Sequence, residues 1–142
     1  MTQSYLLDTN AVSDIAKMGD AKQKPILAHM ANALKAGSTL YISSITLFEL
    51  EHGVLLGQGR ISKAQQQRIQ EAMALFLVKS FDKKAALEAA NIAAELSRKG
   101  QKISTMDALI AGHARQLGFI CVTHNLREFG RVPKLKVEDW TE

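Results

Sequence analysis

Cysteine, long apolar runs and repetitive segments are scarce or missing in this sequence, and each shortage excludes a class of protein. Cys121 is the single cysteine, so the chain can form neither an internal disulfide nor a metal site built from several thiolates. The longest apolar runs fall far short of a membrane span, and the N-terminus lacks the basic start and apolar block of a signal peptide. We therefore expect a cytosolic protein that does not enter membranes.

The chain also lacks repeats, low-complexity tracts and proline- or glycine-rich linkers, so no internal domain boundary is visible. Its 142 residues are 46% apolar and 23% charged, which is an ordinary globular composition with enough chain for one core. We predict a single domain over residues 1–142. The net charge of +4 is small and its basic residues are scattered, so charge is compatible with a nucleic-acid partner without identifying one.

Short β-prone apolar runs alternate with longer stretches of helical character. The strand candidates are residues 5–7, 40–43, 76–79 and 119–123, with a weaker one at 135–137. The clearest helix candidate, residues 83–99, repeats apolar side chains at the spacing of one helix face: Ala85, Ala89, Ile92 and Leu96. This alternation predicts an α/β fold with a mainly parallel sheet and helices on both faces. In such sheets ligands bind at the carboxyl ends of the strands.

Asp8 directly follows the first strand candidate, in the stretch YLLDTN. One interpretation is a helix N-cap, because Asp, Thr and Asn side chains all accept hydrogen bonds from the first turn of a helix, here one starting near Ala11. The other is a functional acid at the tip of a buried strand. The residue by itself leaves both interpretations open.

Glu49 lies on a helix candidate after the second strand, in ITLFELEHG. Glu49 and Glu51 could simply be two solvated acids of that helix. However, apolar residues occur around nearly the whole circumference of the helix, which predicts that it is largely buried. An acid on a buried helix needs a partner or a cation to offset its desolvation.

Asp107 begins the stretch DALIAGHA, a helix candidate, and falls in the middle of the apolar face of this helix. A functional acid is one interpretation, and a cap is the other, because Ser104, Thr105 and Asp107 could all start the helix. Thr123 and Asn125 follow the fourth strand candidate, with Glu128 three residues later. That last segment could equally be a polar loop with a surface acid. The four histidines, His29, His52, His113 and His124, show no metal-ligand spacing, and we interpret them as surface or packing residues.

Taken together, an acid stands at or near three successive strand-to-helix junctions. If the carboxyl ends of the strands cluster, three like charges meet in one partly buried pocket, where mutual repulsion raises their pKa values unless a cation bridges them. Carboxylate and water oxygens select Mg²⁺ or Mn²⁺ over zinc. The chemistry that such a site favours is metal-assisted phosphodiester hydrolysis.

Four motifs in order, LLDTN, ITLFELEHG, DALIAGHA and THNLREFGRVPKLKVEDW, resemble the PIN-domain ribonucleases, and most closely the VapC toxins of bacterial type II toxin–antitoxin pairs. The resemblance covers essentially the full length. It implies a three-layer α/β/α sandwich with a four- or five-stranded, mainly parallel sheet, and a Mg²⁺-dependent endoribonuclease, with Mn²⁺ as a possible substitute.

Transferred to this chain, the resemblance makes Asp8, Glu49 and Asp107 the catalytic and metal-binding acids. Glu49 is chosen over Glu51 because the family pattern Glu-Leu-x-x-Gly is matched by Glu49, Leu50 and Gly53. Many relatives carry a fourth acid where Asn125 stands, so occupancy of a second metal site stays open, and Glu128 could supply the missing charge. The residues expected to support the acids are Thr9, Asn10, Thr123, Asn125 and Glu128.

The resemblance also implies partners. One partner is a second copy of the chain, and another is a VapB-type antitoxin that covers the site within a larger assembly. The third is a structured RNA, in particular a transfer RNA. The expected location of the assembly is the bacterial cytoplasm. We expect the helix pair at residues 45–59 and 62–76 to form the antitoxin groove, and Arg127 and Arg131 to contact RNA phosphate. The alternative is a catalytically weak PIN scaffold that binds RNA or antitoxin. A haloacid-dehalogenase-like phosphatase is disfavoured because Asn10 stands where it needs a second Asp.

Overall fold

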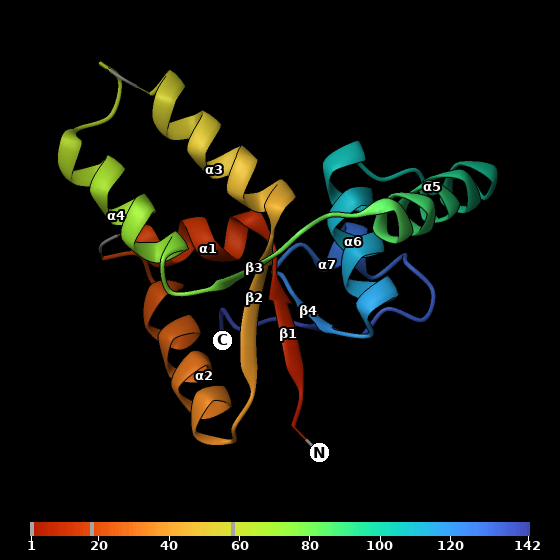
Figure 1. Cartoon of the computed structure of the whole chain (residues 1–142), viewed down its shortest axis with the longest axis horizontal. Coiled ribbons are helices and arrows are strands. Elements are labelled where there is room, and N and C mark those ends of the chain that lie inside the picture. The colour runs from red at the N-terminus through yellow and green to blue at the C-terminus, as the bar shows by residue number, and fades with distance from the viewer. Residues whose placement is uncertain (1, 18, 58) are drawn as a thin grey trace.

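The computed structural model describes residues 2–17, 19–57 and 59–142, which form a five-stranded, all-parallel sheet (Figure 1). The strands are β1 (Ser4–Leu7), β2 (Thr39–Ser43), β3 (Leu77–Lys79), β4 (Ile120–Val122) and β5 (Val137–Glu138). Their order is β3-β2-β1-β4-β5, so the direction of winding reverses between β1 and β4. Ligands of parallel sheets bind at the carboxyl ends beside such a reversal. The predicted parallel sheet is confirmed.

Helices cover both faces of this sheet, which confirms the three-layer α/β/α arrangement. The helices are α1 (Thr9–Ala16), α2 (Gln23–Lys35), α3 (Ser44–Leu56), α4 (Lys63–Met73), α5 (Lys83–Arg98), α6 (Thr105–Leu117) and α7 (Leu126–Phe129). One core lies between the sheet and α1, α2 and α4, and the other between the sheet and α5, α6 and α7 (Figure 1). Within the described ranges, none of these helices has the length and apolarity that crossing a bilayer requires.

Helices α5 and α6 pack closely because both present small residues at their contact. The predicted apolar face of α5 is confirmed, and its four members are all buried: Ala85, Ala89, Ile92 and Leu96. On α6, a Cβ added to Gly112 would lie 2.5 Å from the Cα of Ala89. Only glycine permits this close approach of α6, the helix that carries Asp107, to α5.

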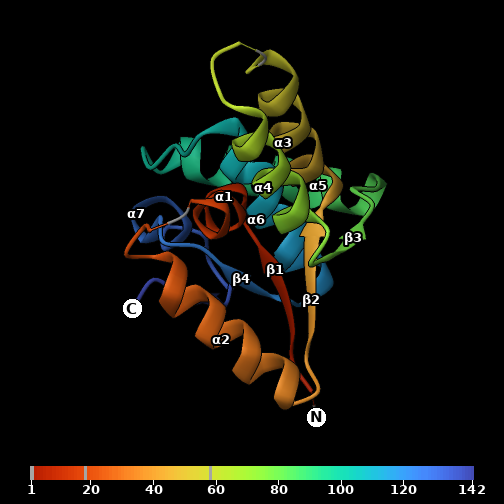
Figure 2. The same ribbon diagram turned by 90° about the vertical axis from the view of Figure 1, so that its left-hand side faces the viewer.

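Helix α3 is less buried than the sequence predicts. Its buried residues are Thr46, Leu50 and Val54, whereas the side chains of Leu47, Phe48, Leu55 and Leu56 are exposed. Figure 2 shows the reason, because α3 rises beyond the end of the sheet with α4 beside it, so the chain covers only one side of the helix. The expectation of a largely buried helix is therefore wrong, and it leaves an apolar surface open.

Candidate active site

Asp8 lies at the carboxyl end of β1, next to the point where the winding reverses. Its backbone N–H donates to the carbonyl of Val122 on β4 (3.0 Å), and its Oδ1 accepts from the backbone N–H of Ala11 (2.8 Å), so it does cap α1. The side chain is nonetheless buried, and burial raises its pKa to about 6. A hydrogen bond from the Thr123 hydroxyl opposes this shift in part.

The capping and functional interpretations of Asp8 are therefore compatible, because the cap uses Oδ1 and leaves Oδ2 for another ligand. The role predicted for Thr123 is consistent with its surroundings. Its side chain is fully buried, and Oγ1 accepts from the backbone N–H of Asn125 (3.0 Å), which leaves the hydroxyl proton for Asp8.

Glu49 is half-buried on α3 and is held by a residue of the first motif. The Thr9 hydroxyl donates to its Oε1 (2.5 Å), and the hydroxyl of Thr46 lies 3.1 Å from Thr9 Oγ1. Thr9 thus stands next to Asp8 in the chain and contacts Glu49 in space, as a supporting residue would. Sequence reasoning missed Thr46, although its position three residues before Glu49 places it on the same side of the helix.

Asp107 occupies the first turn of α6, whose N-cap is Ser104 (Ser104 Oγ accepts from the Asp107 N–H, 3.2 Å). Burial, followed by contact with the Glu128 carboxylate and a smaller contribution from Asp8, raises the pKa of Asp107 to about 7. The same contact lowers the pKa of Glu128. Asn125 joins the two acids, since its Nδ2 donates to Asp107 Oδ2 (3.0 Å) and lies 3.5 Å from Glu128 Oε2.

The structure therefore places the predicted acids along one edge of the sheet. Asp8 and Asp107 interact electrostatically, and Glu49 is tied to the residue after Asp8. The predicted rise in pKa is found for Asp8 and Asp107, but the main cause is burial and the repulsion between charges is secondary. Across residues 2–17, 19–57 and 59–142, no three His, Cys, Asp or Glu side chains are already spaced to hold a metal ion.

The remaining predicted residues lie outside this arrangement. Asn10 is on the exposed side of α1, and Arg127 is exposed on α7. Arg131 uses Nη1 to donate to the carbonyl of Lys102 (3.1 Å), in the loop between α5 and α6. Its guanidinium therefore holds this loop, and it also helps to lower the pKa of Glu128.

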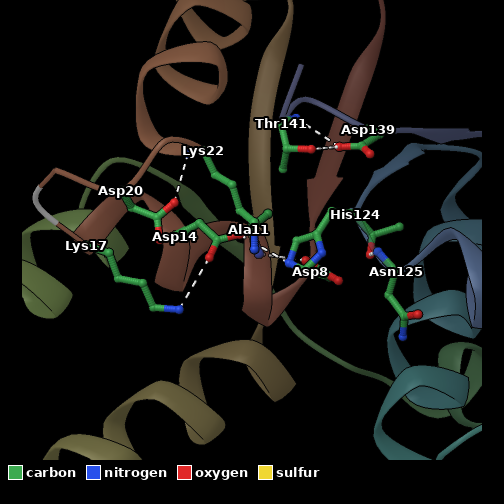
Figure 3. A network of polar contacts seen from close by, with 11 residues as sticks. Asp8, Ala11, Asp14, Lys17, Asp20, Lys22, His124, Asn125, Asp139 and Thr141 are labelled. Atoms are coloured by element: carbon green, nitrogen blue, oxygen red, sulfur yellow. Dashed lines mark hydrogen bonds and ion pairs between the residues drawn. The ribbon is translucent and has the colours of Figure 1, made fainter.

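His124 and Asp14 form a pair that sequence reasoning missed, and the interpretation of His124 as a surface or packing residue is incomplete. Asp14 is buried on α1, and its Oδ2 lies 3.2 Å from Nε2 of His124, close enough for an ion pair although no donor is aligned with that oxygen as a hydrogen bond requires. Figure 3 shows the His124 ring reaching from the loop after β4 toward Asp14, beside Asp8. The only available signal was a second acid, six residues after Asp8, on the buried side of α1.

The donor set suits a hard divalent cation. Asp8, Asp107 and Glu49 supply carboxylate oxygens at one sheet edge. Ionisation is unfavourable for the buried Asp8, and for the half-buried Asp107 that contacts Glu128. A cation would offset that cost, and oxygen ligands favour Mg²⁺ or Mn²⁺. The proton between Asp107 and Glu128 would then have to leave, and the carboxylates would have to approach one another.

The site and the fold together define the class of protein. The profile of the PIN domain matches residues 5–135, which is most of the chain.

Comparison with individual proteins narrows the class. The tRNA(fMet)-specific endonuclease VapC of Salmonella typhimurium (strain LT2) is 36% identical over 138 residues, which cover 96% of this chain and 97% of that protein. The VapC of the same name from Shigella flexneri is 36% identical over 137 residues, covering 96% and 98%. The chain therefore belongs to the VapC family of PIN-domain ribonucleases, as its motifs predicted.

Solved structures agree with this assignment. A chain in the crystal structure of DNA-bound VapBC from Salmonella typhimurium is 34% identical with a TM-score of 0.79, and 99% of each chain is covered. A chain of VapBC2 from Rickettsia felis, bound to a DNA fragment from their promoter, has the same TM-score at 29% identity, covering 97% of this chain and 99% of that one.

Proposed function

We propose that this chain is a Mg²⁺-dependent endoribonuclease toxin that cleaves structured RNA and is neutralised by a cognate antitoxin. The observation that carries the proposal is the pair of acids at the carboxyl edge of the sheet, the buried Asp8 and the half-buried Asp107, whose pKa values are both raised. Such raised pKa values mean that ionisation of these acids is unfavourable in the metal-free site, and a bound cation would stabilise their charged forms. The ribonuclease names of the relatives support the same reaction.

Asp8, Glu49 and Asp107 would hold the metal. When bound, Mg²⁺ supplies charge stabilisation of the phosphate and lowers the pKa of a water nucleophile. The chain's own residues fix the ligands: the cap on α1 orients Asp8, the Thr9 hydroxyl orients Glu49, and Asn125 orients Asp107. Glu128 contacts Asp107 and keeps the shared proton on Asp107, so binding of a cation would release that proton to solvent.

The RNA and the antitoxin are proposed from the relatives together with the surface of this chain. The relatives from Salmonella and Shigella are named as specific for tRNA(fMet), so a transfer RNA is the substrate we propose. Arg127 is exposed on α7, next to Glu128 in the chain, whereas the guanidinium of Arg131 donates to a loop carbonyl, so Arg127 is the better candidate for a phosphate contact. The VapBC complexes among the structural relatives support an antitoxin partner, and a larger assembly with two copies of the chain is part of the proposal.

The test uses Asp8→Asn and Asp107→Asn, purified without antitoxin, in a tRNA(fMet) cleavage assay with Mg²⁺. Asn retains the capping oxygen of Asp8 but removes the charge that would bind the cation, so we expect each variant to lose at least about 100-fold in rate while remaining folded. Glu51→Gln, on the same helix as Glu49, is the control and should cleave like the parent. A parent chain that binds tRNA without cleaving it would support the catalytically weak scaffold instead.

A further inference from the structure

Thr46 has a buried hydroxyl group that the function proposed above does not use. The residue lies in the first turn of α3, and its side chain is fully buried. A valine of nearly the same shape would fill this place without a polar group, whereas a buried hydroxyl is costly unless it has a hydrogen-bond partner. The partner that the structure gives the Thr46 hydroxyl is Thr9, whose Oγ1 lies 3.1 Å away.

The topology of the sheet places these two threonines side by side. Strands β1 and β2 are parallel neighbours, so α1 and α3 start beside each other at the same edge of the sheet. Thr9 is the first residue of α1, and Thr46 comes three residues before Glu49, on the same side of α3. The three side chains therefore link the helix that follows Asp8 to the helix that carries Glu49.

The two contacts of the Thr9 hydroxyl differ in kind. Its Oγ1 lies 2.5 Å from Glu49 Oε1 and 3.1 Å from Thr46 Oγ1. A hydroxyl group has one proton to donate and two lone pairs with which it accepts. The shorter contact, to the carboxyl oxygen, takes the Thr9 proton, so a lone pair of Thr9 accepts the proton of Thr46. The hydrogen bonds thus run in one direction, from Thr46 through Thr9 to Glu49.

This direction determines what Thr46 does for Glu49. A Thr9 hydroxyl without a donor beside it could rotate its proton away from Glu49, whereas a donor at its lone pair keeps the proton directed there. Successive hydrogen bonds also polarise one another, which strengthens the bond to Glu49. That bond uses Oε1 and leaves Oε2 for another ligand. The Glu49 side chain therefore has less conformational freedom to lose when a ligand binds.

We propose that Thr46 is a positioning residue of the acid site: it donates a hydrogen bond to Thr9 and, through Thr9, holds Glu49 ready for a divalent cation. The inference rests on the proposed metal-dependent function and extends it by one residue, which acts through Thr9 alone. Residues that orient metal ligands in this way typically contribute about 10- to 100-fold to metal affinity or activity.

The experiment measures the Mn²⁺ affinity of the full chain, purified without antitoxin, from the electron paramagnetic resonance signal of free Mn²⁺. Thr46→Val removes the hydroxyl and keeps the shape, and we expect it to weaken Mn²⁺ binding by about 10-fold. Thr46→Ser keeps the hydroxyl and should bind Mn²⁺ like the parent. Thr39→Val is the matched control, because Thr39 lies at the opposite, amino end of β2, and it should also bind like the parent.

A second measurement separates positioning from packing. If Thr46 acts through Thr9, adding Thr46→Val to Thr9→Val should cost no further Mn²⁺ affinity, because the link to Glu49 is already broken. A residue that only packs α3 against the rest of the fold would lose the same factor in both backgrounds. Circular dichroism checks that each variant is folded, and Thr46→Ala, which removes the same hydroxyl, is used if Thr46→Val does not fold.

The inference is overturned if Thr46→Val binds Mn²⁺ like the parent, or if it loses the same factor with and without Thr9→Val. Glu49→Gln distinguishes this failure from failure of the proposed function. If Glu49→Gln weakens Mn²⁺ binding and Thr46→Val does not, the acid site stands and only the role of Thr46 is wrong. If Asp8→Asn, Asp107→Asn and Glu49→Gln all bind Mn²⁺ like the parent, the proposed metal site itself is wrong.

Discussion

At the residue scale, Asp8 caps α1 with one carboxylate oxygen and leaves the other for the proposed metal site. Its Oδ1 caps α1, and the remaining oxygen faces a buried setting in which ionisation is unfavourable. Asp is one of the best N-cap residues, so a cap explains why an acid is tolerated at a strand tip. It does not explain the burial. In the metal-free protein this burial costs stability at neutral pH.

The free-energy cost of ionising the buried Asp8 side chain predicts that the stability difference between Asp8→Asn and the parent depends on pH. Between about pH 4 and pH 6 the unfolded chain has released the Asp8 proton while the folded chain retains it, so the free energy of unfolding falls as pH rises through this window. Asn keeps the cap without the charge, and we expect Asp8→Asn to be more stable than the parent at pH 7 by about 1–3 kcal/mol, and equal to it below pH 4. Urea denaturation in EDTA at pH 4, 5, 6 and 7 measures this.

Magnesium provides the second arm of that experiment. A cation bound by Asp8 in the folded state alone raises the free energy of unfolding, so Mg²⁺ should raise the melting temperature of the parent and not that of Asp8→Asn. Equal stability of the two metal-free proteins at pH 7 would show that the Asp8 charge is already compensated.

Glu128 gives a second prediction at this scale. Its carboxylate adds to the effect of burial in raising the pKa of Asp107, so Glu128→Ala should lower the pKa of Asp107 from about 7. Carbon-detected NMR titration of the metal-free protein measures this directly, with Glu51→Gln as a control that leaves Asp107 unchanged. The acid limb of the cleavage rate should move to lower pH in the same variant. An unmoved Asp107 would mean that burial alone sets its pKa.

The sequence was most informative about these residues where a strand end fixed their position. Asp8, Thr9, Thr123 and Asn125 all lie where the carboxyl ends of β1 and β4 place them, whereas Asp107 lies in the first turn of α6, which follows helix α5 and not a strand as the sequence predicted. The pairing of Asp14 with His124 could not be predicted, because it joins residues 110 positions apart through a loop whose path depends on tertiary packing.

At the element scale, the helix that carries Asp107, α6, packs closely against α5. Gly112→Ala would place a Cβ against the backbone of Ala89, which cannot move without shifting a whole helix. We expect a loss of about 1–3 kcal/mol in the free energy of unfolding, measured by urea denaturation, together with slower RNA cleavage because α6 carries Asp107.

Gly53→Ala is the matched control on α3. A Cβ at Gly53 would meet nothing within 4 Å, so this variant should gain about 0.5–1 kcal/mol from helix propensity alone. If both variants lost stability equally, the close approach at Gly112 would not be the cause.

In α3, the spacing of apolar residues in the sequence did not predict which side of the helix is buried. Apolar residues around a whole helix predict burial, but they do not say what buries it. Here the sheet and α4 cover one side, and Phe48 and Leu55 remain 63% and 58% exposed. The parallel sheet, by contrast, was predictable because alternating strands and helices permit few connections.

At the scale of the whole molecule, the exposed side of α3 carries apolar side chains that no part of the described chain covers. Leu47, Phe48 and Leu55 line a hollow of about 350 Å³ on this helix, and exposed apolar surface of this kind marks an interaction site. The VapBC relatives are solved with their antitoxins, and the helix pair α3 and α4 is where the sequence predicted an antitoxin to bind.

Charged substitutions on this surface separate antitoxin binding from catalysis. Phe48→Glu and Leu55→Glu place a charge where an apolar antitoxin segment would pack, and we expect each to weaken antitoxin binding by at least about 30-fold in calorimetry. Leu87→Glu, an equally exposed leucine on α5, should bind normally. All three should cleave RNA like the parent, because none contacts the acids. If antitoxin binding survives while the mass measured by light scattering falls from dimer to monomer, α3 joins two copies of the toxin, and the antitoxin must reach the acid site over another face.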